Sequence, residues 1–224
     1  MRSISVIVPA FNAEKTLEDT LQSIVAQTRP VDEIIVVDDG STDATAKIAA
    51  TVPGVHVIHQ KNSGVGLALN TGLAVAKHSF IALLDADDIW SPACLDIHMA
   101  NLEKFPQLDA SVGWVSEFVC QSLPPSTAAR FQPRPAQVGW ISGATLFSLA
   151  AFQRAGEFNP MLRGGAWIDW VDRARRAGVN FGVVNEIVLQ RRLHPGSLST
   201  SAATRGGLAL TGAVRLAIAR RRQQ

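Results

Sequence analysis

The sequence EIIVVDDGSTD, residues 33–43, joins a short apolar run to a polar turn and the beginning of a helix. We expect a strand at 33–37, because its apolar residues follow one another without alternation, as in strands buried on both faces. The Ser-Thr-Asp at 41–43 offers side-chain oxygens that cap a helix N-terminus, which predicts a helix as far as Ala50. A strand that leads directly into a helix indicates an α/β fold.

The same unit recurs on either side of this stretch. Further strands are expected at 4–8, 55–58 and 80–84, and helical spacing of apolar residues follows the first and second of them. This alternation predicts a Rossmann-like, mostly parallel central sheet with helices on both faces. Ligands of such sheets bind beyond the carboxyl ends of the strands, where clustered aspartates follow 33–37 and 80–84.

The second half of the chain is less regular. Four prolines between residues 122 and 137 predict a surface excursion. Beyond it, the apolar patterns predict a strand at 140–149, a helix at 168–177, one or two strands at 181–189 and a basic-ended helix at 208–222. The expected organisation is one domain over 1–200, with halves at 1–110 and 111–200, followed by a C-terminal basic helix at 201–224.

Composition excludes several classes of protein. Of the 224 residues, 47% are apolar and 18% are charged, which argues against intrinsic disorder. The two cysteines, Cys94 and Cys120, make neither a disulfide framework nor a zinc site, and the N-terminus lacks the pattern of a signal peptide. No run approaches 18 uncharged apolar residues, so no membrane span is predicted. We therefore expect a cytoplasmic protein.

Charge is divided unevenly between the two halves. Residues 1–110 contain 7 Lys and Arg against 14 Asp and Glu, whereas residues 111–224 contain 14 against 5. The net charge of +2 is therefore the sum of an acidic first half and a basic second half, which we expect to interact with ligands of opposite charge. The arginine cluster near the C-terminus is too short to favour nucleic acid as a partner.

Three aspartates within four residues follow the strand expected at 80–84. Asp85, Asp87 and Asp88 repel one another, and a bound cation relieves that repulsion. Carboxylate oxygens in this number suit Mg²⁺ or Mn²⁺ with positions left open for phosphate oxygens, which points to a diphosphate ligand; a solvated turn is the alternative. The Gly-rich residues 62–66 match neither a Walker loop nor a dinucleotide fingerprint, which disfavours P-loop kinases and dehydrogenases.

Five motifs in order resemble the family 2 glycosyltransferases of the GT-A fold. They are VPAFN at 8–12, LQSIVAQT at 21–28, EIIVVDDGSTD at 33–43, Asn-x-Gly at 62–64 with Ala-x-Asn-x-Gly at 68–72, and LDADD at 84–88 with Pro92. The resemblance is close over about the first 105 residues and looser to about residue 200. It implies a GT-A fold with an irregular, acceptor-side C-terminal part. It also implies an enzyme that moves a sugar from a nucleotide-diphosphate donor, expected to be a UDP-sugar, to an acceptor hydroxyl.

The resemblance assigns roles on the donor side. The loop at 10–12 is expected to hold base and ribose, Asp39 to accept the N3–H of uracil, and Asp85 to face the ribose. The metal, Mn²⁺ or Mg²⁺, is expected on Asp87, with His194 as a further ligand and Arg191 or Arg192 on the phosphates. The residues expected to bind the nucleotide sugar are Pro9, Ala10, Phe11, Asn12, Asp39, Asn62, Gly66, Asn70, Asp85, Ala86, Asp87 and Arg192.

On the acceptor side the resemblance is incomplete. Inverting members use one displacement, in which a carboxylate takes the proton of the acceptor hydroxyl. The usual Glu-Asp pair is missing, and with Arg173 aligned to the family's arginine the base position falls on Trp167. Asp169 is the expected base, and an ion pair with a nearby arginine is the alternative role for it. Trp140, Trp167 and Trp170 either line the sugar or acceptor cleft or belong to the core.

Other functions and partners remain open at this point. One alternative is a catalytically impaired relative that binds nucleotide sugars; another is a sugar nucleotidyltransferase, although residues 9–12 are not its usual Gly-rich and basic phosphate loop. The acceptor is unknown: a glycan, a lipid-linked molecule, a peptide or a small molecule. The basic helix at 208–222 either packs on the domain or contacts an anionic membrane surface, which would place the protein at the inner membrane face.

Overall fold

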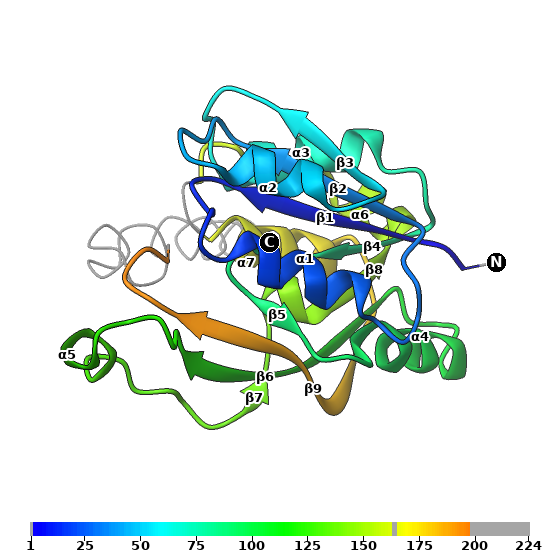
Figure 1. Cartoon of the computed structure of the whole chain (residues 1–224). Helices are drawn as coiled ribbons and strands as arrows, with labels where there is room; N and C mark the ends of the chain where they lie inside the picture. Colours follow the sequence, from blue (N-terminus) through cyan, green and yellow to red (C-terminus); the bar gives the residue numbers. More distant parts are fainter. Residues whose placement is uncertain (1, 163–164, 198–224) are drawn as a thin grey trace.

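The computed structural model describes residues 2–162 and 165–197 (Figure 1). Within these residues the centre is a nine-stranded sheet with the order β3-β2-β1-β4-β8-β6-β9-β5, and β7 pairs with β6. The strands are β1 (Ile4–Ala10), β2 (Glu33–Asp38), β3 (Val55–His59), β4 (Phe80–Leu83), β5 (Ile89–Trp90), β6 (Ala110–Val119), β7 (Gln137–Val138), β8 (Thr145–Ser148) and β9 (Phe181–Leu193). The helices are α1 (Leu17–Val25), α2 (Thr45–Thr51), α3 (Val65–Val75), α4 (Cys94–Lys104), α5 (Pro125–Ala128), α6 (Leu149–Ala155) and α7 (Ala166–Arg176), with a 3₁₀ helix η1 (Ser142–Ala144).

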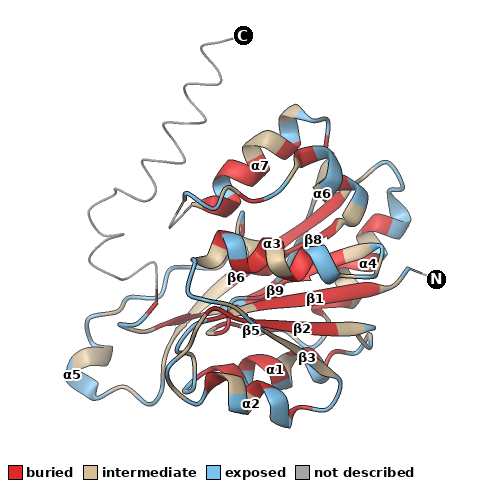
Figure 2. Ribbon diagram, turned by 90° about the horizontal axis from the view of Figure 1, so that it is seen from above, coloured by how far each residue is buried: buried red, intermediate tan, exposed pale blue. Residues whose placement is uncertain are grey.

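Strands β3, β2, β1 and β4 run parallel and confirm the predicted alternation of strands and helices. Successive side chains of a strand point to opposite faces of the sheet, so each apolar run contributes to two cores. Val6 and Val36 pack in the core that α1, α2 and α4 cover, and Ile7 and Ile35 pack in the core under α3, α6 and α7. Figure 2 shows α1 and α2 on one side of the sheet and α3, α6 and α7 on the other.

Beyond β4 the sheet becomes mixed. Strand β8 runs antiparallel to both β4 and β6, β9 runs parallel to β6, and β5 is antiparallel to β9. The strand predicted at 140–149 is confirmed only for β8, because η1 occupies the residues before β8. The chain turns into α6 directly after β8, and the Ser148 side chain caps α6 by accepting the N–H of Ala151 at 3.1 Å. Strand β9 is one strand that runs to Leu193, past the predicted end at residue 189. It therefore carries Arg191 and Arg192 to the carboxyl end of the parallel strands.

Trp167 and Trp170 belong to an aromatic cluster under α7. Their rings stack with centroids 5.1 Å apart, and the Phe147 ring lies 4.9 Å from that of Trp170. Both side chains are buried, so the interpretation that they line an acceptor cleft is wrong. Trp140 does lie at the surface, where the Arg175 guanidinium sits 4.3 Å from its ring centre.

The sheet takes strands from both sides of residue 110, so the acidic and basic halves of the sequence share one sheet. Among the described residues, no helix combines the length and the apolar character needed to cross a membrane. The basic helix predicted at 208–222 lies outside the described residues.

Candidate functional site

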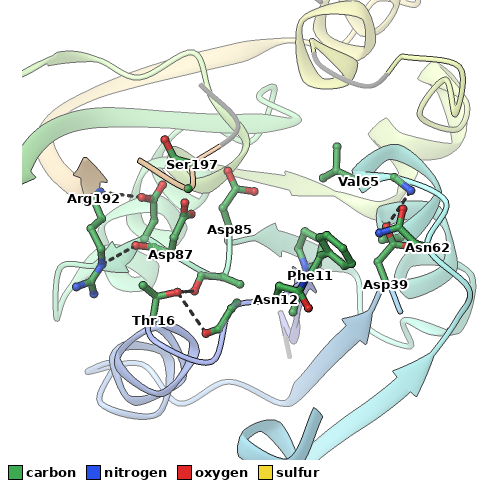
Figure 3. A pocket seen from close by; sticks show the side chains of 18 of the residues that line it. Phe11, Asn12, Thr16, Asp39, Asn62, Val65, Asp85, Asp87, Arg192 and Ser197 are labelled. Atoms are coloured by element: carbon green, nitrogen blue, oxygen red, sulfur yellow. Dashed lines mark hydrogen bonds between the residues drawn. The ribbon is translucent and has the colours of Figure 1, made fainter. Parts of the chain in front are cut away.

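A cavity of about 630 Å³ opens at the carboxyl ends of β1, β2 and β4 (Figure 3). Its wall is completed by the end of β9 and by Pro160 and Met161 from the segment between α6 and α7. The structure brings most of the residues expected to bind the donor or the metal to this cavity, namely Pro9, Ala10, Phe11, Asn12, Asp39, Asn62, Asp85, Ala86, Asp87, Arg192 and His194.

The loop after β1 is fastened to the loop after β2. Asn12 has a left-handed backbone, with φ of 48°. Its N–H donates to the Ser41 hydroxyl at 2.9 Å, and its side-chain oxygen accepts the N–H of Thr42 at 2.9 Å. The neighbouring Phe11 keeps 50% of its surface exposed and lines the cavity. The Phe11 ring therefore lies on a loop that hydrogen bonds from Asn12 fix to the loop after β2.

Asp38 and Asp39 divide two tasks between them. Asp38 accepts the N–H of Ser41 at 3.1 Å and closes the turn, as one of the two was expected to do. Asp39 lines the cavity. Its Oδ1 accepts both the Gln60 side-chain amide at 2.7 Å and the N–H of Ser63 at 2.8 Å, whereas its Oδ2 accepts the N–H of Gly64 at 2.8 Å. A carboxylate oxygen has room for two donors, so Asp39 retains acceptor capacity toward a ligand on Oδ2.

The aspartate cluster after β4 forms the charged end of the cavity. One carboxylate oxygen each from Asp85, Asp87 and Asp88 lies within 4.8 Å of the others. Asp85 is exposed at the cavity, and desolvation followed by the charge of Asp87 raises its pKa to about 6. Burial, then Asp87 and Asp85, raises the pKa of Asp88 well above its usual value. Crowded carboxylates of this kind are stabilised by a cation.

His194 reaches this cluster from the end of β9. Its Nε2 lies 2.9 Å from Asp87 Oδ2. Carboxylate oxygens together with an imidazole nitrogen make a donor set that Mn²⁺ or Mg²⁺ accepts, Mn²⁺ being the more tolerant of nitrogen. The residues present therefore fit a divalent cation at the cluster of Asp85, Asp87 and Asp88, with His194 beside Asp87.

Helix α1 and the residues at its two ends hold the segment that carries the aspartates. The Thr16 hydroxyl donates to the carbonyl of Ala86 at 2.8 Å, and the Thr20 hydroxyl donates to the carbonyl of Asp88 at 2.9 Å. Further along, the Gln27 side-chain amide donates to the carbonyl of Ser91 at 2.8 Å. Sequence reasoning missed these roles, although polar residues on the buried face of an amphipathic helix were the available signal.

The two adjacent arginines of β9 have different surroundings. Arg192 is buried; its N–H donates to Asp88 Oδ1, its Nε donates to the carbonyl of Asp87, and its Nη2 donates to Asp19, each at 2.9 Å. These bonds fasten the aspartate loop, a role that the sequence did not predict. Arg192 also lines the cavity, so its predicted contact with the nucleotide sugar stays a prediction. Arg191 lines the cavity, with Nη1 3.8 Å from Glu117 Oε1.

Gly66 and Asn70 do not line the cavity, contrary to expectation. The Asn70 amide bonds both the carbonyl and the N–H of Phe158, at 2.8 and 2.9 Å, and so joins α3 to the segment before α7. A Cβ at Gly66 would lie 3.1 Å from the carbonyl oxygen of Asn159, so glycine lets that segment approach α3 closely. Both residues therefore fix the position of the segment that carries Pro160 and Met161 to the cavity.

Asp169 is also absent from the cavity lining. It has no exposed surface, and Arg173, one helical turn further along α7, donates to its Oδ2 at 2.9 Å. Arg173 is held in turn by the carbonyls of Ala155 and Glu157. A base must reach the proton that it removes, so the expected role of Asp169 as the base does not fit, and the alternative ion pair does.

Some lining residues had no signal in the sequence. Met161 is 84% exposed at the rim of the cavity, and Val65 and Ser197 also line it. Met161 and Ser197 lie outside the motifs of the sequence, whereas Val65 belongs to the Gly-rich residues 62–66 and was not itself singled out. In Figure 3, Asp85 and Asp87 lie toward one end of the cavity and Asp39 and Asn62 toward the other, with Phe11 between them.

The sequence is similar to known glycosyltransferases. The sequence model described as "Glycosyl transferase family 2" matches residues 5–141. The amylovoran biosynthesis glycosyltransferase AmsE of Erwinia amylovora is 37% identical over 121 residues, which cover 51% of this chain and 46% of AmsE. The uncharacterized glycosyltransferase YibD of Escherichia coli K12 is 39% identical over 89 residues, which cover 38% of this chain and 26% of YibD. The chain thus spans less than half the length of these curated relatives.

The fold has solved counterparts. The crystal structure of S. aureus TarS 1–349 in complex with UDP-GlcNAc matches with a TM-score of 0.72 at 21% identity, over 89% of this chain and 61% of that chain. This likeness confirms the predicted fold class, a mixed α/β structure similar to GT-A glycosyltransferases.

Proposed function

The chain belongs to glycosyl transferase family 2, and on that premise we propose that it moves a sugar from a UDP-sugar to an acceptor with the help of Mn²⁺ or Mg²⁺. The observation that carries the proposal is that one cavity combines an exposed aromatic ring, a carboxylate with spare acceptor capacity and a cluster of aspartates beside a histidine. A volume of about 630 Å³ lies within the range of small-molecule sites.

The nucleotide would lie between the two ends of the cavity. Phe11 offers its ring to the face of the base, and Asp39 accepts the N3–H of uracil through its Oδ2, the oxygen with a single donor. Asp85 faces the ribose, and Asp87 with His194 holds the cation next to the diphosphate. The existence of TarS structures with UDP and with UDP-GlcNAc supports uridine as the base.

The reaction would be a single displacement with inversion at the anomeric carbon. A bound cation supplies neutralisation of the charge that develops on the departing nucleoside diphosphate. The chain's own part is to orient the donor through Phe11 and Asp39. Thr16, Thr20 and Arg192 keep the aspartate loop in one conformation, so that little reorganisation accompanies the reaction.

The test is release of UDP from a panel of UDP-sugars with Mn²⁺, combined with thermal shifts for UDP, GDP, CDP and dTDP with and without Mn²⁺. We expect UDP to give the largest shift, and the shift to require the metal. Neither binding nor release of UDP would contradict the proposal, and a larger shift with another nucleotide would overturn the uridine assignment.

A second candidate is a relative that binds nucleotide sugars without transferring them. The burial of Asp169 against Arg173 favours it, because the expected base does not reach the cavity. Metal-dependent UDP binding without turnover on any acceptor would support this candidate over the transferase.

A further inference from the structure

The carboxylate of Asp39 is enclosed by the loop between β3 and α3, residues 60–64. Asp39 is buried. Three donors from this loop reach its carboxylate at 2.7 to 2.8 Å: the side-chain amide of Gln60 and the backbone N–H groups of Ser63 and Gly64. The first two of these donors bind Oδ1 and fill it. The remaining acceptor position is on Oδ2, the oxygen that is assigned above to the base.

The donor from Gln60 differs from the other two because it belongs to a side chain. Any residue except proline would supply the backbone N–H groups at positions 63 and 64. The Gln60 side chain has several rotatable bonds, so holding its amide on Asp39 requires a further contact. Thr71 of α3 makes that contact, since its hydroxyl donates to Gln60 Oε1 at 2.7 Å. Thr71, Gln60 and Asp39 therefore form a chain of hydrogen bonds from α3 to the cavity.

The chemistry of the three groups fixes the direction of this chain. An ionised carboxylate only accepts hydrogen bonds, so the amide nitrogen of Gln60 must face Asp39 and the amide oxygen must face Thr71. The amide oxygen also only accepts, so the Thr71 hydroxyl must be its donor. A reversed amide would set its oxygen against the carboxylate. Thr71 thus holds Gln60 in the orientation that delivers a donor to Asp39 Oδ1.

The turn after β2 lies directly against the same loop. Gly40 has a left-handed backbone with φ of 77°, and a Cβ there would lie 2.7 Å from the backbone nitrogen of Asn62. Glycine therefore permits the close approach that brings Asp39 within reach of the donors on residues 60–64. Asn62 lies at the same end of the cavity as Asp39 (Figure 3). The loop after β3 thus sets the position of the Asp39 carboxylate.

We propose that Gln60 and Thr71 are positioning residues that set which base the donor site prefers. Neither of them is among the residues that line the cavity, so they act through Asp39. Their chain of bonds fills Oδ1 and leaves Oδ2 as the oxygen available to the base, where it selects a ring N–H. Uracil has such a group at N3, whereas N3 of cytosine is an acceptor. This inference rests on the proposed donor site and names residues that make uridine the preferred nucleoside.

Two nucleotides separate this role from a general effect on the fold. UDP and CDP share the ribose and the diphosphate and differ in the pairing edge of the base. Isothermal titration of each into the full chain with Mn²⁺ measures both affinities. We expect the unaltered protein to bind UDP at least about tenfold more tightly than CDP. A variant that disturbs only the bond between Asp39 and the base should weaken UDP and leave CDP nearly unchanged, because CDP does not make that bond.

Three variants test the chain of bonds. Gln60→Met keeps the length of the side chain and removes the amide, which should lower UDP affinity by about tenfold and CDP affinity by less than about twofold. Thr71→Val should lower UDP affinity by about threefold, because Gln60 can then turn away from Asp39, and Thr71→Ser should restore it. Gln22→Met is the matched control, since Gln22 is exposed on α1 and does not line the cavity. It should match the unaltered protein with both nucleotides.

The outcomes distinguish this inference from the proposed function. Absence of UDP binding to the unaltered protein overturns the donor site and this inference with it. Metal-dependent UDP binding in which Gln60→Met weakens UDP and CDP by the same factor, or weakens neither, overturns the positioning role and leaves the donor site standing. If Gln60→Met does not fold, the same comparison between Thr71→Val and Thr71→Ser decides: equal UDP affinities in these two variants overturn the positioning role.

Discussion

Asp85 shows how the surroundings of one residue set its chemistry. Desolvation and the neighbouring charge of Asp87 raise its pKa to about 6, so a proton competes with a cation for this carboxylate near neutral pH. A raised pKa in the folded state also means that the metal-free protein loses stability as the pH rises through about 6, and bound metal compensates for that loss. We therefore expect Mn²⁺ to raise Tm more at about pH 7 than at about pH 5.

This prediction is checked by thermal unfolding with and without Mn²⁺ at the two pH values. Asp85→Asn removes one titrating group, and its Mn²⁺ shift should be smaller and should change less with pH, the dependence that is left coming from Asp88, whose pKa is also raised. The same shift at both pH values in the unaltered protein would count against a metal on Asp85.

The adjacent arginines make a second test at the residue scale. Arg192→Gln removes donors from the carbonyl of Asp87 and from Asp19, and we expect a loss of about 2 kcal/mol in the free energy of unfolding, with weaker Mn²⁺ binding. Arg191→Gln, its control, should change the free energy of unfolding by less than about 1 kcal/mol. Urea unfolding of both variants measures the difference, and equal losses would refute the distinction between the two side chains.

At the scale of elements, α1 acts on the site without forming most of its surface. Thr20 is fully buried and donates to the carbonyl of Asp88. Thr20→Val keeps the shape but leaves that carbonyl without this donor, which should cost about 1–3 kcal/mol in the free energy of unfolding and weaken Mn²⁺ binding. Thr20→Ser restores the hydroxyl and should recover most of both.

The control for this prediction is Thr51→Val on α2. The Thr51 hydroxyl donates to the carbonyl of Ile48 in an exposed position, where water can replace the bond. Denaturant unfolding measures the free energy of unfolding of the three variants, and a Mn²⁺ titration measures their metal affinity. A Thr20→Val protein that binds Mn²⁺ as tightly as the unaltered protein would show that α1 does not position the aspartates.

The elements also show where reading the sequence succeeds. Strands β1, β2 and β4 and the loops that follow them were predicted, because each is a local run of apolar residues ending in a polar turn. The bonds from α1 and the residues beside it to residues 86–91 join segments more than 60 positions apart. A local pattern can mark buried polar residues on the helix, but it does not identify their partners. The end of β9 was predicted too early, because residues 190–192 are polar, and pairing with β6 continues the strand.

For the whole molecule, the donor side of the site was largely predictable and the acceptor side was not. The expected residues at 9–12, Asp39 and 85–87 meet because the carboxyl ends of parallel strands share one edge of the sheet. Asp169 was misassigned because its exposure depends on how α7 packs. Its spacing of four residues from Arg173 was the sequence feature that pointed to the ion pair.

The central claim is that the aspartate cluster binds a cation that the nucleotide needs. Isothermal titration of UDP into the full chain, with Mn²⁺ and with a chelator, tests it most directly, with Asp87→Ala as the variant and Asp96→Ala, a surface acid paired with Arg29, as the control. We expect UDP affinity to fall at least about tenfold without metal, Asp87→Ala to behave alike with and without Mn²⁺, and Asp96→Ala to match the unaltered protein. UDP affinity that is the same with Mn²⁺ and with the chelator, or that survives Asp87→Ala unchanged, would contradict the account.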